Sequence, residues 1–286
     1  MVRKFFTALA LSAGMTTAAF AQVEGKVTFD GQAPARKPVP GITNDANCSK
    51  LHKTAPLDES VIVGKGGELA NVVVYLKGDL KGDAPADEVH LDQVNCIYTP
   101  HVVSVTVGQK LIAMNSDPFL HNVHTLPENN APINKAQPVK GQKDTIPTKA
   151  AETFKVKCDV HPWMAAWVAV FDHPFHGVTG EDGVFFFETK GLKDGDYDVV
   201  AWHEKFKECA TGKVTIKGGK GKVDLKVTPK AALAPANERE VLVSTVVKGP
   251  TCCTDGSKCA ETAAKAKAEA EAKAKADPKT AGATAQ

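Results

Sequence analysis

Residues 154–167 have the sequence FKVKCDVHPWMAAW. Apolar and polar side chains alternate over the first part of this stretch, which predicts a strand, and Cys158, His161 and Met164 follow at intervals of three residues. A thiolate, an imidazole and a thioether are soft metal ligands, and a blue-copper electron-transfer site uses two histidines, one cysteine and a weak axial methionine. One histidine is therefore still missing from the set.

The second histidine lies upstream, in residues 115–123, NSDPFLHNV. An Asn…His-Asn-Val segment followed by a Cys-x2-His-x2-Met loop resembles the plastocyanin/amicyanin branch of the cupredoxins, and the short loop is most similar to that of amicyanin. The resemblance covers about residues 61–171, with a first hairpin expected at 25–34. It implies a Greek-key β-sandwich that holds one type 1 copper near one end and carries single electrons. The copper ligands that it implies are His121, Cys158, His161 and Met164.

The same resemblance implies two supporting features. Asn122 would tie the His121 loop to the backbone around Cys158. The ring edge of His161 would emerge through an apolar surface at which a redox protein partner docks. Candidates for that surface are Phe119, Pro162 and Trp163, and packing in the core is an equally good reading for Trp163.

Five further histidines leave alternatives open. His124 could replace His121 as a ligand, although His121 carries the His-Asn-Val context. A separate zinc or type 2 copper site could involve the downstream histidines, but a His-x2-His pair on a loop is a weak indication without a third ligand. The histidines whose role the sequence leaves open are His101, His124, His173, His176 and His203.

The first 21 residues predict a secretory signal peptide. Arg3 and Lys4 precede the apolar residues 5–15, and Ala-Phe-Ala at 19–21 is a cleavage motif, so we expect cleavage after Ala21 and a periplasmic or secreted protein. No other stretch approaches the roughly 20 apolar residues of a membrane helix, so no membrane span is expected.

Composition and motifs exclude several function classes. Loss of Arg3 and Lys4 from the 35 basic residues balances the charge against the 33 acidic ones, so nucleic acid is not an expected partner. No nucleophile elbow, P-loop, Rossmann glycine pattern or His-Glu-x2-His motif occurs. None of the nine histidines forms the His-x-His pair common in multicopper oxidases and copper nitrite reductases. We therefore expect no enzymatic activity.

Seven cysteines in an exported chain call for disulfide pairing. If Cys158 binds metal, an even number remains, as an oxidising compartment favours. We expect Cys48 to pair with Cys96, because both lie in the cupredoxin half. Pairing stays open for Cys209, Cys252, Cys253 and Cys259.

The downstream half predicts a second, smaller antiparallel β-sandwich. Its Thr-x2-Asp-Gly-x-Phe and Gly-x-Tyr patterns, at 179–185 and 195–197, resemble the carboxypeptidase regulatory-like, transthyretin-like modules of exported proteins. The Ala/Lys/Glu-rich end has high helix propensity without an apolar face. The expected organisation is all-β: a cupredoxin domain at 22–172, the second sandwich at 173–230, a cysteine-containing extension at 231–259 and a partly helical tail at 260–286.

Two hypotheses of function follow. In the first, the protein is an exported one-electron carrier, and its C-terminal sandwich orients it on a partner or at the cell surface. In the second, it is a binding or structural module of the cell envelope, or stores or delivers copper. An intense thiolate-to-copper absorption band with reversible reduction would favour the first, and colourless Cu(I) binding would favour the second.

Overall fold

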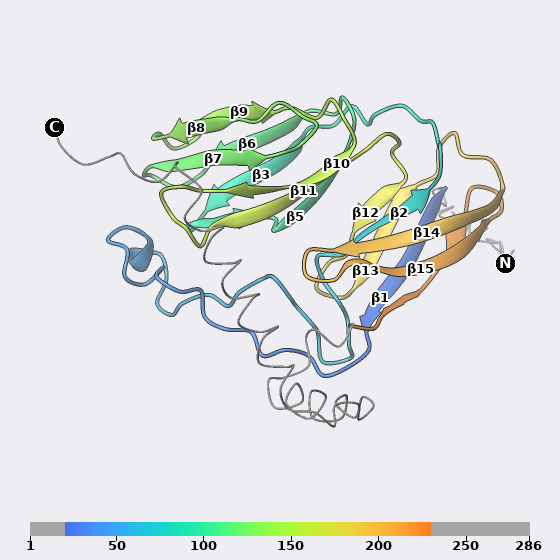
Figure 1. Cartoon of the computed structure of the whole chain (residues 1–286), viewed down its shortest axis with the longest axis horizontal. Coiled ribbons are helices and arrows are strands. Elements are labelled where there is room, and N and C mark those ends of the chain that lie inside the picture. Colours follow the sequence, from blue (N-terminus) through green and yellow to red (C-terminus); the bar gives the residue numbers. More distant parts are fainter. Residues whose placement is uncertain (1–20, 230–286) are drawn as a thin grey trace, which may run out of the picture. The chain divides into compact units, whose positions relative to one another are not determined.

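The computed structural model describes residues 21–229, which form seventeen β-strands and one short 3-10 helix, η1 (Cys48–Lys50) (Figure 1). The predicted all-β fold class is confirmed. Residues 1–20 of the expected signal peptide (1–21), the expected cysteine-containing extension and the expected tail lie outside the described residues, and these expectations stay predictions. Within residues 21–229, no helix has the length and apolar character that crossing a bilayer requires.

Nine strands form a first β-sandwich, here called sandwich A. They are β3 (Val89–Val94), β4 (Ile97–Thr99), β5 (Val102–Thr106), β6 (Leu111–Asn115), β7 (His121–Leu126), β8 (Asn134–Gln137), β9 (Lys143–Ile146), β10 (Glu152–Lys157) and β11 (Ala165–Phe171). One sheet has the order β5-β11-β10-β7-β8 and the other β4-β3-β6-β9. Neighbours are antiparallel except in the parallel pairs β5–β11 and β3–β6.

The alternating pattern of β10 places one of its faces in the core of sandwich A. Phe154 and Val156 are buried, whereas Lys155 between them is exposed. They share one apolar cluster with Leu91 and Tyr98 of the opposite sheet. Removal of this apolar surface from water is the main stabilising contribution, and it fixes the register with which β10 delivers Cys158 to the end of the sheet.

The other strands form sandwich B. They are β1 (Gln22–Phe29), β2 (Val73–Lys77), β12 (His176–Val178), β13 (Val184–Glu188), β14 (Gly195–His203), β15 (Lys207–Ile216), β16 (Gly221–Lys222) and β17 (Leu225–Val227). One sheet has the order β13-β1-β16, with β17 also paired to β1, and the other has the order β12-β2-β14-β15. A separate apolar cluster lies between these sheets.

The strand pairing differs from the expected division of the chain at residue 172. β1 and β2, expected in the cupredoxin half, pair instead with β13 and with β12 and β14. Sandwich B is thus built from strands that precede sandwich A in the sequence and from strands that follow it. Alternation shows which face of a strand is buried but not which strand it pairs with. The glycine at position 25 is explained by the close approach of the chain at Val223, because a Cβ at Gly25 would lie 1.7 Å from the Val223 carbonyl oxygen.

The connection between β1 and β2 includes residues 35–58, here called the capping segment. Its ends are held together by a bridge between Pro38 and Leu57, which lies beside hydrogen bonds from Arg36 to two carbonyl oxygens. The predicted Cys48–Cys96 disulfide is present and joins η1 to the turn between β3 and β4. The capping segment is therefore fastened to sandwich A.

Candidate metal centre

Three of the four predicted ligands belong to the loop between β10 and β11. The N–H of Cys158 donates to the carbonyl of Met164 over 3.1 Å, and the N–H of Met164 donates to the carbonyl of His161 over 2.9 Å. These bonds close the loop tightly. His121 is the first residue of β7, which pairs with β10, so the fourth predicted ligand is delivered to the same end of the sheet.

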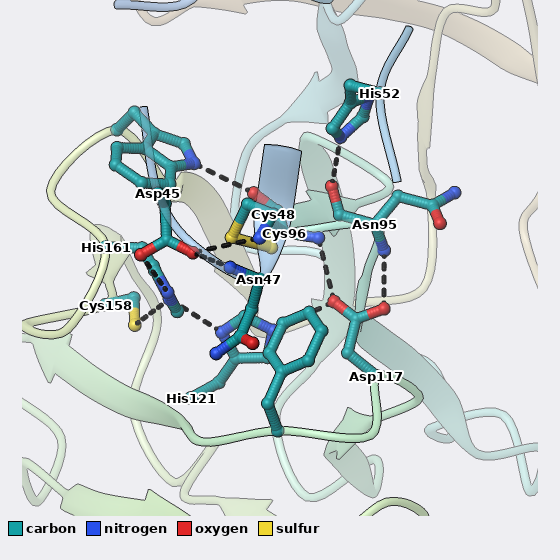
Figure 2. Close-up of a disulfide and its surroundings, with 12 residues drawn as sticks. Asp45, Asn47, Cys48, His52, Asn95, Cys96, Asp117, His121, Cys158 and His161 are labelled. Carbon is teal, nitrogen blue, oxygen red and sulfur yellow. Dashed lines mark hydrogen bonds and ion pairs between the residues drawn. A yellow bond between two sulfur atoms is a disulfide. The ribbon is translucent and has the colours of Figure 1, made fainter. Parts of the chain in front are cut away.

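The structure brings His121, Cys158 and His161 together. Their potential ligand atoms all lie within 4.8 Å of one another, and all three residues are buried. The Nδ1 atoms of His121 and His161 are 2.9 Å apart, and the Cys158 Sγ lies 3.8 Å from the His161 Nδ1 (Figure 2).

These separations fit one shared metal ion. Zinc, for comparison, binds nitrogen at about 2.0 Å and sulfur at about 2.3 Å. At angles of about 90–125° those bond lengths place two nitrogens about 2.8–3.5 Å apart and a sulfur and a nitrogen about 3.1–3.8 Å apart. A thiolate with two imidazoles is a donor set that suits copper. The residues present therefore fit the metal that the sequence predicts.

Met164 lies beside this group rather than at the surface. It is 1% exposed and belongs to the same buried cluster as Cys158. A thioether there is a weak ligand, and its burial also keeps water from that side of the centre.

The electrostatics of the centre favour a thiolate. Burial opposes ionisation of Cys158, but hydrogen bonds from His121, His161 and the Asn122 N–H lower its pKa to about 6. Burial disfavours a charged His121, but its hydrogen bonds to Asp117 and Cys158 raise its pKa overall. Cys158 therefore has the ionised form that metal binding needs already near neutral pH.

Asn122 joins the two halves of the site. Its N–H points to the Cys158 Sγ at 3.4 Å, and its side-chain oxygen accepts from the Asp159 N–H at 2.5 Å. Its side-chain amide donates to Asn134 over 2.6 Å. These bonds tie the residue after His121 to the residue after Cys158, which is the supporting arrangement that the resemblance implies.

Asp117 is a residue of the site that the sequence did not reveal. Its Oδ2 lies 2.9 Å from the His121 Nε2, and its two oxygens accept from the N–H groups of Asn95 and Cys96, each over 2.8 Å. Burial opposes its ionisation, but these bonds lower its pKa. The sequence offers only the spacing Asp-x3-His, and this spacing does not by itself show that the two side chains meet.

The expectation that the His161 edge emerges at the surface is wrong for this chain. His161 is 3% exposed. Its Nε2 lies 3.8 Å from the Asp45 Oδ2 of the capping segment, and the Trp163 ring lies 5.2 Å away. Trp163 itself donates to the Cys96 carbonyl over 3.1 Å. The capping segment therefore covers the face at which the resemblance implies docking.

The five histidines whose role the sequence leaves open do not join the centre, and within residues 21–229 none of them belongs to a group of three potential metal ligands. His124 faces Asp159 at 2.8 Å, and His101 faces Glu204 at 2.7 Å. The remaining three stack on phenylalanine rings: His173 and His176 on Phe171, and His203 on Phe206.

The structure describes one of the four cysteines whose pairing the sequence leaves open. Cys209 has no disulfide partner within residues 21–229, and burial raises its pKa to about 12. The cysteines with which it could otherwise pair, Cys252, Cys253 and Cys259, lie outside the described residues.

No protein-family model and no curated protein matches the sequence. Among solved structures, the copper-containing nitrite reductase (NirK) from Thermus scotoductus SA-01 is similar at 19% identity, covering 34% of this chain and 25% of that one, with a TM-score of 0.29. Amicyanin from Paracoccus versutus is similar at 22% identity over 34% of this chain and 96% of that one, with a TM-score of 0.27. A purple cupredoxin from Nitrosopumilus maritimus is similar at 22% identity over 29% and 97%, with a TM-score of 0.25. The chain spans about a quarter of the length of the nitrite reductase it matches.

Proposed function

We propose that this protein carries single electrons through one type 1 copper, held by His121, Cys158, His161 and Met164. The observation that carries the proposal is the convergence of the Cys158 sulfur and one ring nitrogen from each of His121 and His161 within 4.8 Å of one another in a buried site. When bound, copper would supply a one-electron couple. We also propose export to the periplasm or beyond, no enzymatic activity of its own and a protein as the redox partner.

The side chains have separate parts in this function. Cys158 would bind the metal as a thiolate, and the two histidines would bind it through Nδ1 with their protons held on Nε2. Met164 would supply a weak thioether ligand. The backbone hydrogen bonds of the loop hold three of these groups in place before metal arrives, so a change of oxidation state requires little rearrangement.

Spectroscopy of the copper-loaded mature protein tests this function. We expect an intense visible thiolate-to-copper band, a narrow copper hyperfine splitting in electron paramagnetic resonance and reversible reduction. Cys158→Ser should remove the band, whereas Met164→Gln should keep it and lower the reduction potential, because an oxygen donor is harder than a thioether. A parent protein without the band, or a Cys158→Ser variant that keeps it, would refute the ligand set.

Copper storage or delivery within the cell envelope is the second candidate. One observation favours it: the capping segment and Trp163 leave His161 only 3% exposed, which closes the direct route for a partner to that ring. Cu(I) binding without a visible band, together with transfer of copper to an acceptor chelating protein, would support this candidate over the carrier.

The resemblance of sandwich B to carboxypeptidase regulatory-like modules remains a prediction. We propose that this sandwich serves attachment to a cell-envelope partner rather than chemistry, because no group of three potential metal ligands within residues 21–229 involves its side chains. Comparison of cell-fraction binding for the whole protein and for variants on the exposed side of β13 would test that role.

A further inference from the structure

The Cys48–Cys96 disulfide is flanked by two aspartates. The backbone N–H of Cys48 donates to the Asp45 Oδ1 over 2.9 Å, and the backbone N–H of Cys96 donates to the Asp117 Oδ2 over 2.8 Å. Figure 2 shows both carboxylates beside the sulfur–sulfur bond. Each half of the disulfide thus holds one carboxylate through its own backbone.

The same two carboxylates face the two histidines of the centre. The Asp117 Oδ2 lies 2.9 Å from the His121 Nε2, which is hydrogen-bonding distance. The Asp45 Oδ2 lies 3.8 Å from the His161 Nε2, which is an electrostatic contact longer than a hydrogen bond. Both carboxylates therefore approach the ring nitrogen that points away from Cys158.

This placement decides which nitrogen of each ring can accept a metal. A neutral imidazole carries one proton, and the other nitrogen offers the lone pair. The two Nδ1 atoms face each other at 2.9 Å, so both can bind a shared metal only when the protons of His121 and His161 are on Nε2. A carboxylate near Nε2 favours that tautomer and fixes the direction of the ring.

The turn that contains Cys96 is shaped for its part in this arrangement. Asn95 and Cys96 have φ values of 54° and 57°, the left-handed region that non-glycine residues seldom adopt. In this conformation both N–H groups point at one carboxylate, that of Asp117. These two hydrogen bonds stabilise the turn, and the disulfide links its Cys96 to the capping segment.

Asp45 depends on the disulfide for a different reason. It lies in the capping segment, outside any strand, and its Oδ1 accepts from the N–H groups of Asn47 and Cys48. The segment also contacts sandwich A through the buried Ile42 and through His52, whose Nε2 lies 2.7 Å from the Asn95 carbonyl oxygen. The disulfide is the covalent member of these attachments.

We propose that Asp117 and Asp45 are positioning residues that keep a proton on Nε2 of His121 and of His161 and direct both Nδ1 atoms toward Cys158, and that the Cys48–Cys96 disulfide fixes the two carboxylates together. The consequence for copper rests on the proposed function. The claim about the histidine rings concerns the metal-free protein, so the two can be tested apart.

The metal-free test reads the histidine tautomers directly. Protein labelled with ¹⁵N-histidine is studied by long-range ¹H–¹⁵N correlation spectra, which distinguish a protonated from an unprotonated ring nitrogen. In the parent, His121 should carry a proton on Nε2. Asp117→Asn should lower the occupancy of that proton, and Asp45→Asn should change the His161 signals only. The Cys48→Ala/Cys96→Ala double variant should change both histidines.

Glu152→Gln is the matched control. Glu152 also accepts from several backbone N–H groups, those of residues 128, 129 and 130, but within residues 21–229 it has no hydrogen bond with a histidine. We expect this variant to leave the signals of His121 and His161 unchanged. If Asp117→Asn behaves like Glu152→Gln, the positioning role is refuted.

The copper test uses competition with a chelator and the visible spectrum. Loss of a carboxylate that supports a ligand histidine typically lowers metal affinity by about 10–100-fold. We expect Asp117→Asn to lower copper affinity by a factor in that range, and Asp45→Asn to lower it by less than about 10-fold. If the histidine signals respond as described but the parent gives no thiolate-to-copper band, the proposed function fails and the positioning role stands. If copper binds with the band while both aspartate variants keep parental histidine signals, the proposed function stands and the positioning role is refuted.

A double-mutant cycle tests the role of the disulfide. Removal of the disulfide in the Asp117→Asn background should lower copper affinity less than its removal from the parent, because the two changes act on one path. Equal losses in both backgrounds would refute the coupling. Far-ultraviolet circular dichroism of each variant establishes that it is folded, and the single Asp45→Asn variant, which keeps the disulfide, supplies an independent result if the double variant is not.

Discussion

Cys158 is expected to titrate near neutral pH in the metal-free protein. Its pKa is lowered from 9.0 to about 6, although burial opposes the thiolate, because His121, His161 and the Asn122 N–H hydrogen-bond to the sulfur. A change of that size corresponds to about 4 kcal/mol of preferential stabilisation of the thiolate. At pH 8 the thiolate fraction would be about 99%, against about 10% for a thiol with a pKa of 9.

The sign of the pH effect on stability follows from the same change. A pKa lowered by folding stabilises the protein fully above pH 9, and this contribution is lost as the pH falls toward 6. The raised pKa of His121 acts in the other direction, since its contribution is present below about 6.5 and lost as the pH rises through the folded value. The two effects partly cancel in unfolding measurements, so the thiolate should be measured directly.

The assay is the ultraviolet absorbance of the thiolate near 240 nm as a function of pH. The difference between the parent and Cys158→Ser isolates this one sulfur from other cysteines, and burial raises the pKa of Cys209 to about 12, outside the range. We expect a midpoint near pH 6 that rises in His121→Ala. A midpoint above about pH 8 in the parent would refute the account of the hydrogen bonds around the sulfur.

Three further predictions concern stability, each measured as the free energy of unfolding in denaturant. The disulfide closes a separation of 48 residues, so Cys48→Ala/Cys96→Ala should lower it by about 4 kcal/mol through the entropy of the unfolded chain. Gly25→Ala should lower it by about 1–3 kcal/mol or more, because the new Cβ would lie 1.7 Å from the Val223 carbonyl oxygen. Tyr98→Phe should lower it by about 1 kcal/mol, since the buried hydroxyl donates to the Asn122 carbonyl over 2.7 Å.

Each of these has an outcome that contradicts it. Tyr197→Phe is the control for Tyr98, because its hydroxyl also donates to a carbonyl, that of Lys193, but at an exposed position. Equal losses from the two tyrosine variants would show that burial is not what makes the Tyr98 bond matter. A Gly25→Ala variant as stable as the parent would contradict the close approach of β1 to the chain at Val223. Parental stability without the disulfide would mean that the capping segment is held by its other contacts.

Local spacing predicted the metal centre better than it predicted the architecture around it. Cys158, His161 and Met164 lie in one short loop, so their proximity needed no knowledge of the fold. The pairing of Cys48 with Cys96 also followed from the sequence and is confirmed. β1 and β2 were expected beside the cupredoxin strands and pair elsewhere, because an alternating pattern does not encode the partner of a strand.

Asp45 and Asp117 show why the sequence predicted the ligands but not the carboxylates that contact them. Asp45 has a local role visible in its spacing, since its Oδ1 accepts from the N–H groups two and three residues later, a common use of aspartate in turns. Its other oxygen approaches His161 because the capping segment returns to sandwich A, where the disulfide, Ile42 and His52 attach it. A ligand set can be encoded within a few residues, whereas the groups that orient those ligands come from wherever the chain returns to the site. In this protein a disulfide fixes one such return of the chain, so the residues that would orient the ligands of the candidate metal centre lie around the disulfide as well as beside the ligand loop.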